Sequence, residues 1–222
     1  KHTFFNHAKP VNGMASNTLR IITMKTLHTL FLASFFIATQ SHARTTISVN
    51  TTNDENGENT AHCSFREDIK AVNDQQAFGG CKAGERFGTN IIALEDSTYT
   101  LINGEITISH DLTISGYNTN NKELKDTVTL IKPKRMPPST TISGGLKRIF
   151  NTANDKPTLT LQNLIIKDGK ADLGGGILVG GTLTLQNTIF TNNTATTAGG
   201  AVYLVGRDST MSAVDSTFTK NT

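Results

Sequence analysis

The chain has 222 residues, the size of one ordinary domain, and its low aromatic content of 6% without Trp argues against a core built on aromatic residues. The formal net charge of +3 arises near the N-terminus, because all 18 acidic residues follow residue 43 while four basic residues precede it. The remainder is slightly acidic, so a nucleic-acid or membrane partner recognised by basic charge is excluded.

Residues 24–43 (MKTLHTLFLASFFIATQSHA) have the layout of a signal peptide, with a basic start at Lys25 and an apolar stretch over about residues 30–38. The small residues Ser41 and Ala43 suit a signal peptidase. A membrane anchor is the alternative, but the stretch is far shorter than the roughly 20 residues that span a bilayer. We expect export, a mature chain that starts at about Arg44 without a transmembrane helix, and an upstream or leader role for residues 1–23.

Two cysteines, Cys63 and Cys81, follow the expected cleavage site. In an oxidising compartment an even pair predicts a disulfide, and two free thiols are the alternative. Closing a loop of about 18 residues would stabilise the fold by roughly 3 kcal/mol in the chain-entropy description.

The segment CSFREDIKAVND (residues 63–74) predicts a short helix from about Ser64 to Asn73. Ser64 and Glu67 have the spacing of a capping box, in which each side chain satisfies a backbone donor of the first turn. An apolar stripe follows at three positions with helical spacing: Phe65, Ile69 and Val72. A helix this short is unstable alone, so it must pack on an apolar surface.

Short strands separated by turn residues fill the rest of the chain, and a repeat becomes visible near its end. TLTLQNLIIKDG begins at Thr158, TLTLQNTIFTNN at Thr182 and TMSAVDSTFTKN at Thr210. Aligning these segments predicts a core ladder of Ile166, Phe190 and Phe218. The aligned Gly169, Asn193 and Asn221 are residue types that readily adopt positive φ. The glycine-rich segments at 174–179 and 199–204 predict a third strand in each turn after a glycine corner.

This pattern predicts an all-β fold, a parallel β-helix whose coils stack on one another. An antiparallel meander is the rival, but it leaves the aligned ladder unexplained. We expect residues 44–116 to form the N-terminal cap and first coils, 117–157 a protruding loop insertion, and 158–222 further coils that are truncated at the C-terminal end. The capped helix would then be a lid on the open end of the first coil.

CSFREDI resembles the CSLREA motif of exported bacterial β-helix proteins, with Phe65 in place of the usual Leu and Asp68 in place of the usual Ala. The segment GGGILVGGTLTLQNTIFTNNTA is similar to repeats of polymorphic outer-membrane proteins. The resemblance covers about residues 46–116 and 158–222. It implies a right-handed, pectin-lyase-like β-helix. The replacement at Asp68 is expected to weaken the capping α-helix slightly without touching its buried stripe.

No catalytic motif is found, and only His62 and His110 remain after the signal segment, which excludes a His/Cys zinc site. Residues 53–58 (NDENGE) could bind calcium but lack the spacing of a calcium loop, so a polar turn without a metal is the better interpretation. Asp155, Asp168 and Asp172 are expected on solvent-facing turns. The basic run at 132–135 is expected in a solvated loop.

We therefore expect a secreted or outer-membrane-surface protein with no catalytic residue in this chain, no cofactor and an adhesin-like role. Its expected partners are glycans or proteins of host or neighbouring cells. The alternative function is a carbohydrate-active enzyme, a polysaccharide lyase or glycoside hydrolase, on the same scaffold. It would require carboxylates and a base that converge on one face of adjacent coils.

Overall fold

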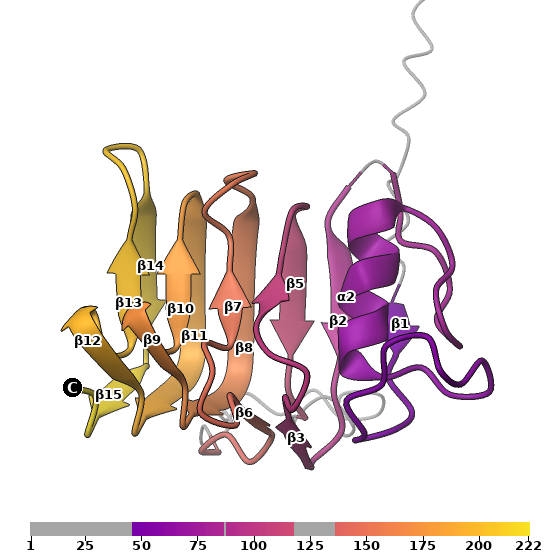
Figure 1. Ribbon diagram of the computed structural model, residues 1–222, viewed down its shortest axis with the longest axis horizontal. Coiled ribbons are helices and arrows are strands. Elements are labelled where there is room, and N and C mark those ends of the chain that lie inside the picture. Colours follow the sequence, from indigo (N-terminus) through magenta and orange to yellow (C-terminus); the bar gives the residue numbers. More distant parts are fainter. Residues whose placement is uncertain (1–45, 87, 118–135) are drawn as a thin grey trace, which may run out of the picture. The chain divides into compact units, whose positions relative to one another are not determined.

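The computed structural model describes residues 46–86, 88–117 and 136–222. These residues form parallel strands stacked as a β-solenoid of about 4 turns, with one helix near its N-terminal end (Figure 1). The expectation of a parallel β-helix is confirmed. The predicted signal peptide at 24–43 and the basic run at 132–135 lie outside the described residues.

The first coil follows helix α2 (Phe65–Asp74), and strands at matching positions of successive coils pair in parallel. The strand before the helix and the strands of the first two coils are β1 (Thr46–Ser48), β2 (Asn90–Ala93), β3 (Thr98–Thr100), β4 (Ile106–Thr107), β5 (Leu112–Ser115), β6 (Thr141–Ser143) and β7 (Phe150–Asn151). The later strands are β8 (Thr158–Lys167), β9 (Lys170–Leu173), β10 (Ile177–Val179), β11 (Thr182–Thr191), β12 (Thr194–Ala198), β13 (Val202–Leu204), β14 (Thr210–Val214) and β15 (Thr217–Thr219).

Three parallel sheets run along the solenoid. The largest has the order β1-β2-β5-β8-β11-β14, and its second branch joins β3 to β6, β6 to β8, and β15 to β11. The others are β13-β10-β7-β4 and β12-β9. The long strands β8 and β11 belong to both branches because each turns a corner at an asparagine, Asn163 or Asn187, with φ of 55° and 49°. Asn187 Nδ2 donates to Asn163 Oδ1 at 2.9 Å, which ties neighbouring corners together.

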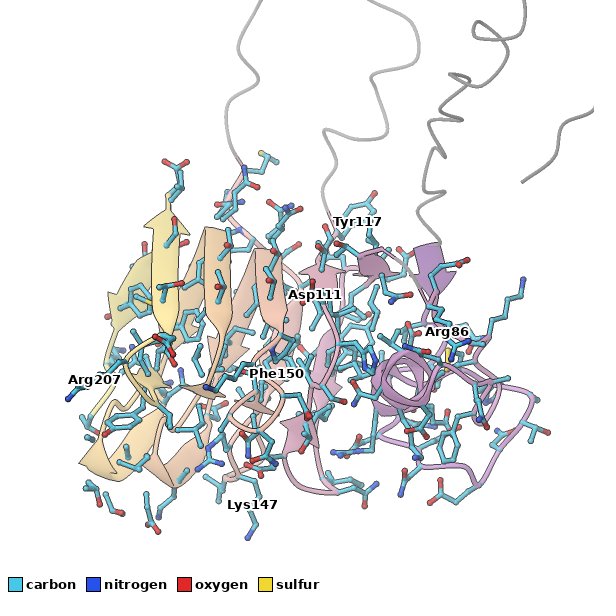
Figure 2. The ribbon with its side chains drawn as sticks, turned by 90° about the horizontal axis from the view of Figure 1, so that it is seen from above. Arg86, Asp111, Tyr117, Lys147, Phe150 and Arg207 are labelled. Carbon is cyan, nitrogen blue, oxygen red and sulfur yellow. A yellow bond between two sulfur atoms is a disulfide. The ribbon has the colours of Figure 1, made fainter. Side chains whose placement is uncertain are left out.

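The repeat register places Ile166, Phe190 and Phe218 in one ladder across β8, β11 and β15. Ile166 and Phe190 are fully buried, and the rings of Phe190 and Phe218 stack with centroids 5.1 Å apart. Phe218 is 42% exposed because β15 lies at the edge of its sheet. Figure 2 shows Phe150 inside the solenoid, with Tyr117 and Lys147 on opposite outer sides.

The expected insertion at 117–157 is too long. Strands β6 and β7 fall inside that interval and complete the second coil, since β6 pairs with β3 and β8 and β7 pairs with β4 and β10. Both strands are so short that no periodic pattern identifies them in the sequence. Residues 118–135 of this interval lie outside the described residues.

The expected role of Gly169, Asn193 and Asn221 in backbone geometry is also wrong. Positive φ occurs one residue earlier, at Asp168, Asn192 and Lys220, with values of 54–57°. The aligned residues after them serve an internal hydrogen-bond ladder instead.

In this internal ladder each asparagine side chain bonds to the coil before it. Asn193 accepts from the Gly169 amide at 2.9 Å and donates to the Ile166 carbonyl at 3.0 Å. Asn221 repeats the pattern by accepting from the Asn193 amide at 3.0 Å and donating to the Phe190 carbonyl at 2.9 Å. Asn193 is fully buried, and these bonds satisfy its polar atoms.

Glycine corners precede β10 and β13 as the sequence predicts. Gly174 and Gly199 have φ of 61° and 70°, and a Cβ on Gly174 would lie 2.3 Å from the Ile177 carbonyl oxygen. Strands β9 and β12, which precede these corners, were not predicted. Neither strand has a buried residue, so the apolar signal in the sequence is weak.

Candidate functional site

The capping box at the N-terminus of α2 also makes hydrogen bonds to the loop that precedes the helix. Ser64 is the N-cap and its Oγ accepts from the Glu67 amide at 3.3 Å, while Glu67 Oε2 accepts from the Ser64 amide at 3.0 Å. Glu67 Oε1 also accepts from the Gly57 amide at 2.7 Å, and Ser64 Oγ donates to the Glu55 carbonyl at 3.0 Å. Both Ser64 and Glu67 are fully buried, so the box is part of the interior.

The apolar stripe of α2 covers the N-terminal end of the core. Phe65, Ile69 and Val72 are at most 2% exposed. The Phe65 ring lies 6.0 Å from the ring of Tyr99 in the first coil and 6.1 Å from that of Phe150 in the second. The helix therefore shields the apolar interior at this end from water.

Polar side chains of the helix also pair with the free backbone beside β4, the edge strand of its sheet. Arg66 donates to the carbonyls of Gly104 at 2.6 Å and Glu105 at 3.2 Å. Asn73 donates to the Thr107 carbonyl at 2.8 Å and accepts from the Ser109 amide at 3.0 Å. These bonds occupy backbone groups that would otherwise invite another strand.

Arg66 has a further task that the sequence interpretation missed. Its guanidinium lies 2.7 Å from Asp54 in the loop before the helix, and the side chains are 11% and 2% exposed. Asp54 Oδ2 also accepts from the Asn103 amide at 2.7 Å. Asp54 is therefore held in an internal ion pair, which favours the polar-turn interpretation of residues 53–58 over a calcium loop. In the sequence, the one signal of this ion pair is the position of Arg66 within the CSFREDI segment.

Cys63 and Cys81 form a disulfide with a Cα–Cα distance of 4.6 Å. Both are 3% exposed and belong to the main core. The bond joins the residue before the N-cap to a short bridge that pairs Phe78 with Cys81. The pairing expected from the sequence is present.

Asp68 is the least expected residue of the cap. It is fully buried, although the sequence places it outside the apolar stripe, and neither carboxyl oxygen has a hydrogen-bond partner. Burial raises the pKa of Asp68 to about 8, so the group is largely protonated at neutral pH. The stripe of Phe65, Ile69 and Val72 is buried as expected, but Asp68 is buried as well, which the sequence did not indicate.

The acidic residues considered for catalysis do not form one cluster. Asp168 lies beside Ser143 and Lys167, whose Nζ is 3.5 Å away, and Asp172 accepts from Thr196 at 2.8 Å. Over the parts of the chain that the structure describes, the one group of three His, Cys, Asp or Glu close enough to share an ion is Cys63, Asp68 and Cys81.

Asp155 instead lines a polar cavity of about 530 Å³. Ten described residues surround it: Glu85, Arg86, Gly88, Asn90, Ser109, His110, Asp111, Asp155, Lys156 and Pro157. Asp111 accepts from the Thr158 amide at 2.7 Å, and the His110 Nε2 lies 2.9 Å from Gln75 Nε2. Carboxylates, a histidine and a lysine thus meet in one concave site, which the sequence did not reveal because they come from three separate turns.

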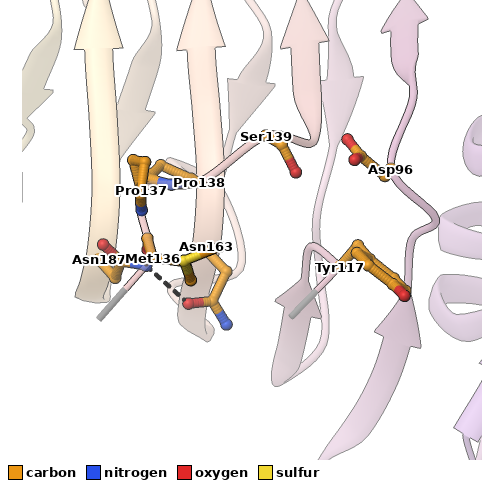
Figure 3. A pocket seen from close by; sticks show the side chains of 8 residues that line it. All are labelled: Asp96, Tyr117, Met136, Pro137, Pro138, Ser139, Asn163 and Asn187. Atoms are coloured by element: carbon orange, nitrogen blue, oxygen red, sulfur yellow. Dashed lines mark hydrogen bonds between the residues drawn. The ribbon is translucent and has the colours of Figure 1, made fainter. Parts of the chain in front are cut away.

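A second cavity, of about 300 Å³, lies near the asparagine corner of the large sheet (Figure 3). Asp96, Tyr117, Met136, Pro137, Pro138, Ser139, Asn163 and Asn187 line it. Asn187 Nδ2 donates to the Met136 carbonyl at 3.1 Å, so the segment that begins at Met136 packs against the corner.

Comparison of the chain with protein-family models, curated proteins and solved structures finds no match. The structure defines the class of protein as a β-solenoid scaffold with a disulfide-bonded helical cap. None of the described helices is long and apolar enough to cross a membrane.

Proposed function

We propose that this chain is an exported bacterial β-helix protein of the CSLREA type that presents a flat polar face for adhesion to glycans or proteins. The CSFREDI segment supports the assignment, because all of its residues except Asp68 contribute to closing the N-terminal end of the solenoid. The disulfide supports export, since such bonds persist in oxidising compartments.

The observation that carries the adhesive role is the outer face of the large sheet. Its outward positions on β5, β8, β11 and β14 are Thr113, Ser115, Thr158, Thr160, Gln162, Thr182, Thr184, Gln186, Thr210, Ser212 and Val214. All of these side chains except Val214 are polar, none is charged, and the register of β8, β11 and β14 has no bulge. We call this set the hydroxyl face.

Rows of hydroxyl and amide groups suit many weak hydrogen bonds to an extended polar ligand. Neighbouring strands repeat them about 4.8 Å apart, so a polymer that lies along the solenoid would meet the same groups in each coil. Repeated weak contacts give useful avidity when they act together.

The test is binding of the full chain to glycan arrays and to bacterial or host cells, with and without the double substitution Thr160→Glu and Thr184→Glu. Two carboxylates on the hydroxyl face should abolish binding and leave the circular dichroism spectrum unchanged. Thr197→Glu on β12, exposed on another sheet, is the matched control and should bind normally. Equal binding by all three proteins would contradict the proposal.

The polar cavity at Asp155 supports a carbohydrate-active enzyme as the second candidate. Three carboxylates (Glu85, Asp111 and Asp155) and a base in one site meet the minimum requirement for acid–base cleavage of a polysaccharide. Turnover of polygalacturonate or a similar polymer that is lost on Asp111→Asn or Asp155→Asn, and retained on Asp172→Asn, would favour this candidate.

A further inference from the structure

A buried carboxyl group that makes no hydrogen bond lies near the disulfide. Asp68 is fully buried, and both its oxygens are without a hydrogen-bond partner. The neighbouring Glu67 is equally buried, but its oxygens accept from the Ser64 and Gly57 amides. A buried polar group without a partner costs stability, so its presence calls for a physical explanation.

The position of this carboxyl group suggests one. A carboxylate oxygen of Asp68 and the Sγ atoms of Cys63 and Cys81 all lie within 4.8 Å of one another. Ligand atoms around a tetrahedral zinc ion lie about 3.6 to 3.8 Å apart, as follows from the usual Zn–S and Zn–O distances. Side-chain movements of about 1 Å would therefore bring the three groups into ligand geometry once the sulfur–sulfur bond is broken.

We propose that reduction of the Cys63–Cys81 disulfide creates a binding site for a thiophilic divalent cation such as Zn²⁺, with both sulfur atoms and one Asp68 oxygen as ligands. A count of histidines and cysteines alone predicts no zinc site, because it leaves out the buried carboxyl group of Asp68. The site belongs to the reduced chain, such as one not yet oxidised after synthesis, and is independent of the proposed adhesive role.

The chemistry has two balanced steps. A dithiol transfers two electrons and two protons to the disulfide, which gives two cysteine thiols and leaves the reductant as a disulfide. The cation then binds as the two thiols and the Asp68 carboxyl group release their protons to solvent. The three negative charges around Zn²⁺ leave one in excess, and the positive end of the α2 dipole is close enough to offset part of it.

A candidate fourth ligand, the Ser64 carbonyl oxygen, lies near both sulfur atoms. The Ser64 carbonyl oxygen lies 3.9 Å from Cys63 Sγ and 3.7 Å from Cys81 Sγ. That oxygen or a water molecule would complete a tetrahedral set, which is the coordination that Zn²⁺ prefers.

The test uses the full chain, reduced with a water-soluble phosphine until two thiols titrate, with circular dichroism to verify the fold. Co²⁺ added to the reduced protein should bind one ion per chain and give thiolate-to-cobalt charge-transfer absorption, and Zn²⁺ should displace it. Bound Zn²⁺ should slow alkylation of both cysteines. The oxidised protein should show none of these signals.

Asp68→Asn separates this site from simple binding by two thiols. It should weaken cobalt affinity of the reduced protein at least ten-fold, since changes even to groups behind the ligands cost 10–100-fold. Asp74→Asn, an exposed residue of the same helix, is the control and should bind like the wild type. Equal affinity of Asp68→Asn and wild type would overturn the proposal. So would a folded reduced protein without charge-transfer bands, or a disulfide that resists reduction while the fold persists.

Discussion

The later coils of the solenoid and its N-terminal cap are stabilised in different ways. In the coils from β8 onward the same contacts recur at aligned positions, as in the ladder of Ile166 and Phe190 and in the Asn193 and Asn221 side-chain bonds. In the cap each contact occurs once, and single residues such as Arg66 and Glu67 join several segments.

This difference teaches where substitution is tolerated. A ladder accepts different apolar residues at one position, as Leu159, Leu183 and Met211 show, because neighbouring coils share the packing. No further coil packs on the outer side of the cap, among the described residues, to compensate for contacts that a substitution removes. We therefore expect its polar residues to be sensitive individually, and Asp68 to be the exception that weakens it.

The largest expected effect is the pH dependence that Asp68 imposes on the oxidised protein. Its pKa is about 8 in the folded state against 3.8 for the free group, and burial is the cause. The unfolded chain therefore loses this proton first, so the contribution of Asp68 to stability is highest below pH 4, falls as pH rises towards 8, and then levels off. The slope is about 1.4 kcal/mol per pH unit, on the order of 4 kcal/mol between pH 4 and 7.

Urea unfolding of wild type and Asp68→Asn across this pH range measures that contribution. The difference in unfolding free energy between the two proteins should grow with pH in favour of the variant, because the amide does not ionise. All other ionisable groups are the same in the two proteins, so their contributions cancel in the difference. A constant difference from pH 4 to 8 would show that Asp68 ionises normally.

The next largest effect is expected in the ladder. Phe190→Ala removes a fully buried ring and should destabilise the protein by about 3 kcal/mol. Phe218→Ala removes a ring that is 42% exposed and should cost less than half as much. Thermal unfolding of both variants measures the ratio, and equal losses would mean that the edge of the sheet is covered in solution.

A smaller effect is expected when the ion pair of the cap is broken. Arg66→Met leaves Asp54 without its cation and should cost about 2 kcal/mol, below the range for fully buried pairs because Arg66 retains some exposure. Adding Asp54→Asn should recover part of this loss. Urea unfolding of the two single variants and the double variant gives the coupling energy, and additive losses would exclude a direct interaction.

The sequence predicts the repeated half of the molecule better than the cap. The Ile166–Phe190–Phe218 ladder is visible because the chain can be compared with itself at a spacing of 24 or 28 residues. The Ser64–Glu67 capping box is visible because it is local. Both kinds of signal come from residues whose spacing is fixed by regular secondary structure.

Contacts that occur once and join distant segments give no such signal. The bond from Asn103 to Asp54 spans 49 residues, and the cavity of His110 and Asp155 brings together three turns. The burial of Asp68 was missed because helical spacing identifies one apolar stripe but cannot show that the disulfide covers a neighbouring face. The positions of β6 and β7 were missed because two- and three-residue strands carry too little periodicity.

The smallest effect expected is that of the helix N-cap, and it tests whether the cap unfolds separately from the coils. Ser64→Ala removes the hydroxyl that accepts from the Glu67 amide and donates to the Glu55 carbonyl, and it should cost about 1 kcal/mol. Because these bonds are confined to the cap, hydrogen exchange should accelerate in residues 65–74 and remain unchanged in β11. Ser216→Ala, far from the cap near β15, is the control and should leave exchange in the helix unaltered. Equal acceleration in α2 and β11 would show instead that cap and coils unfold as one cooperative unit, since local loosening of the helix would then be transmitted through Phe65 to the whole core.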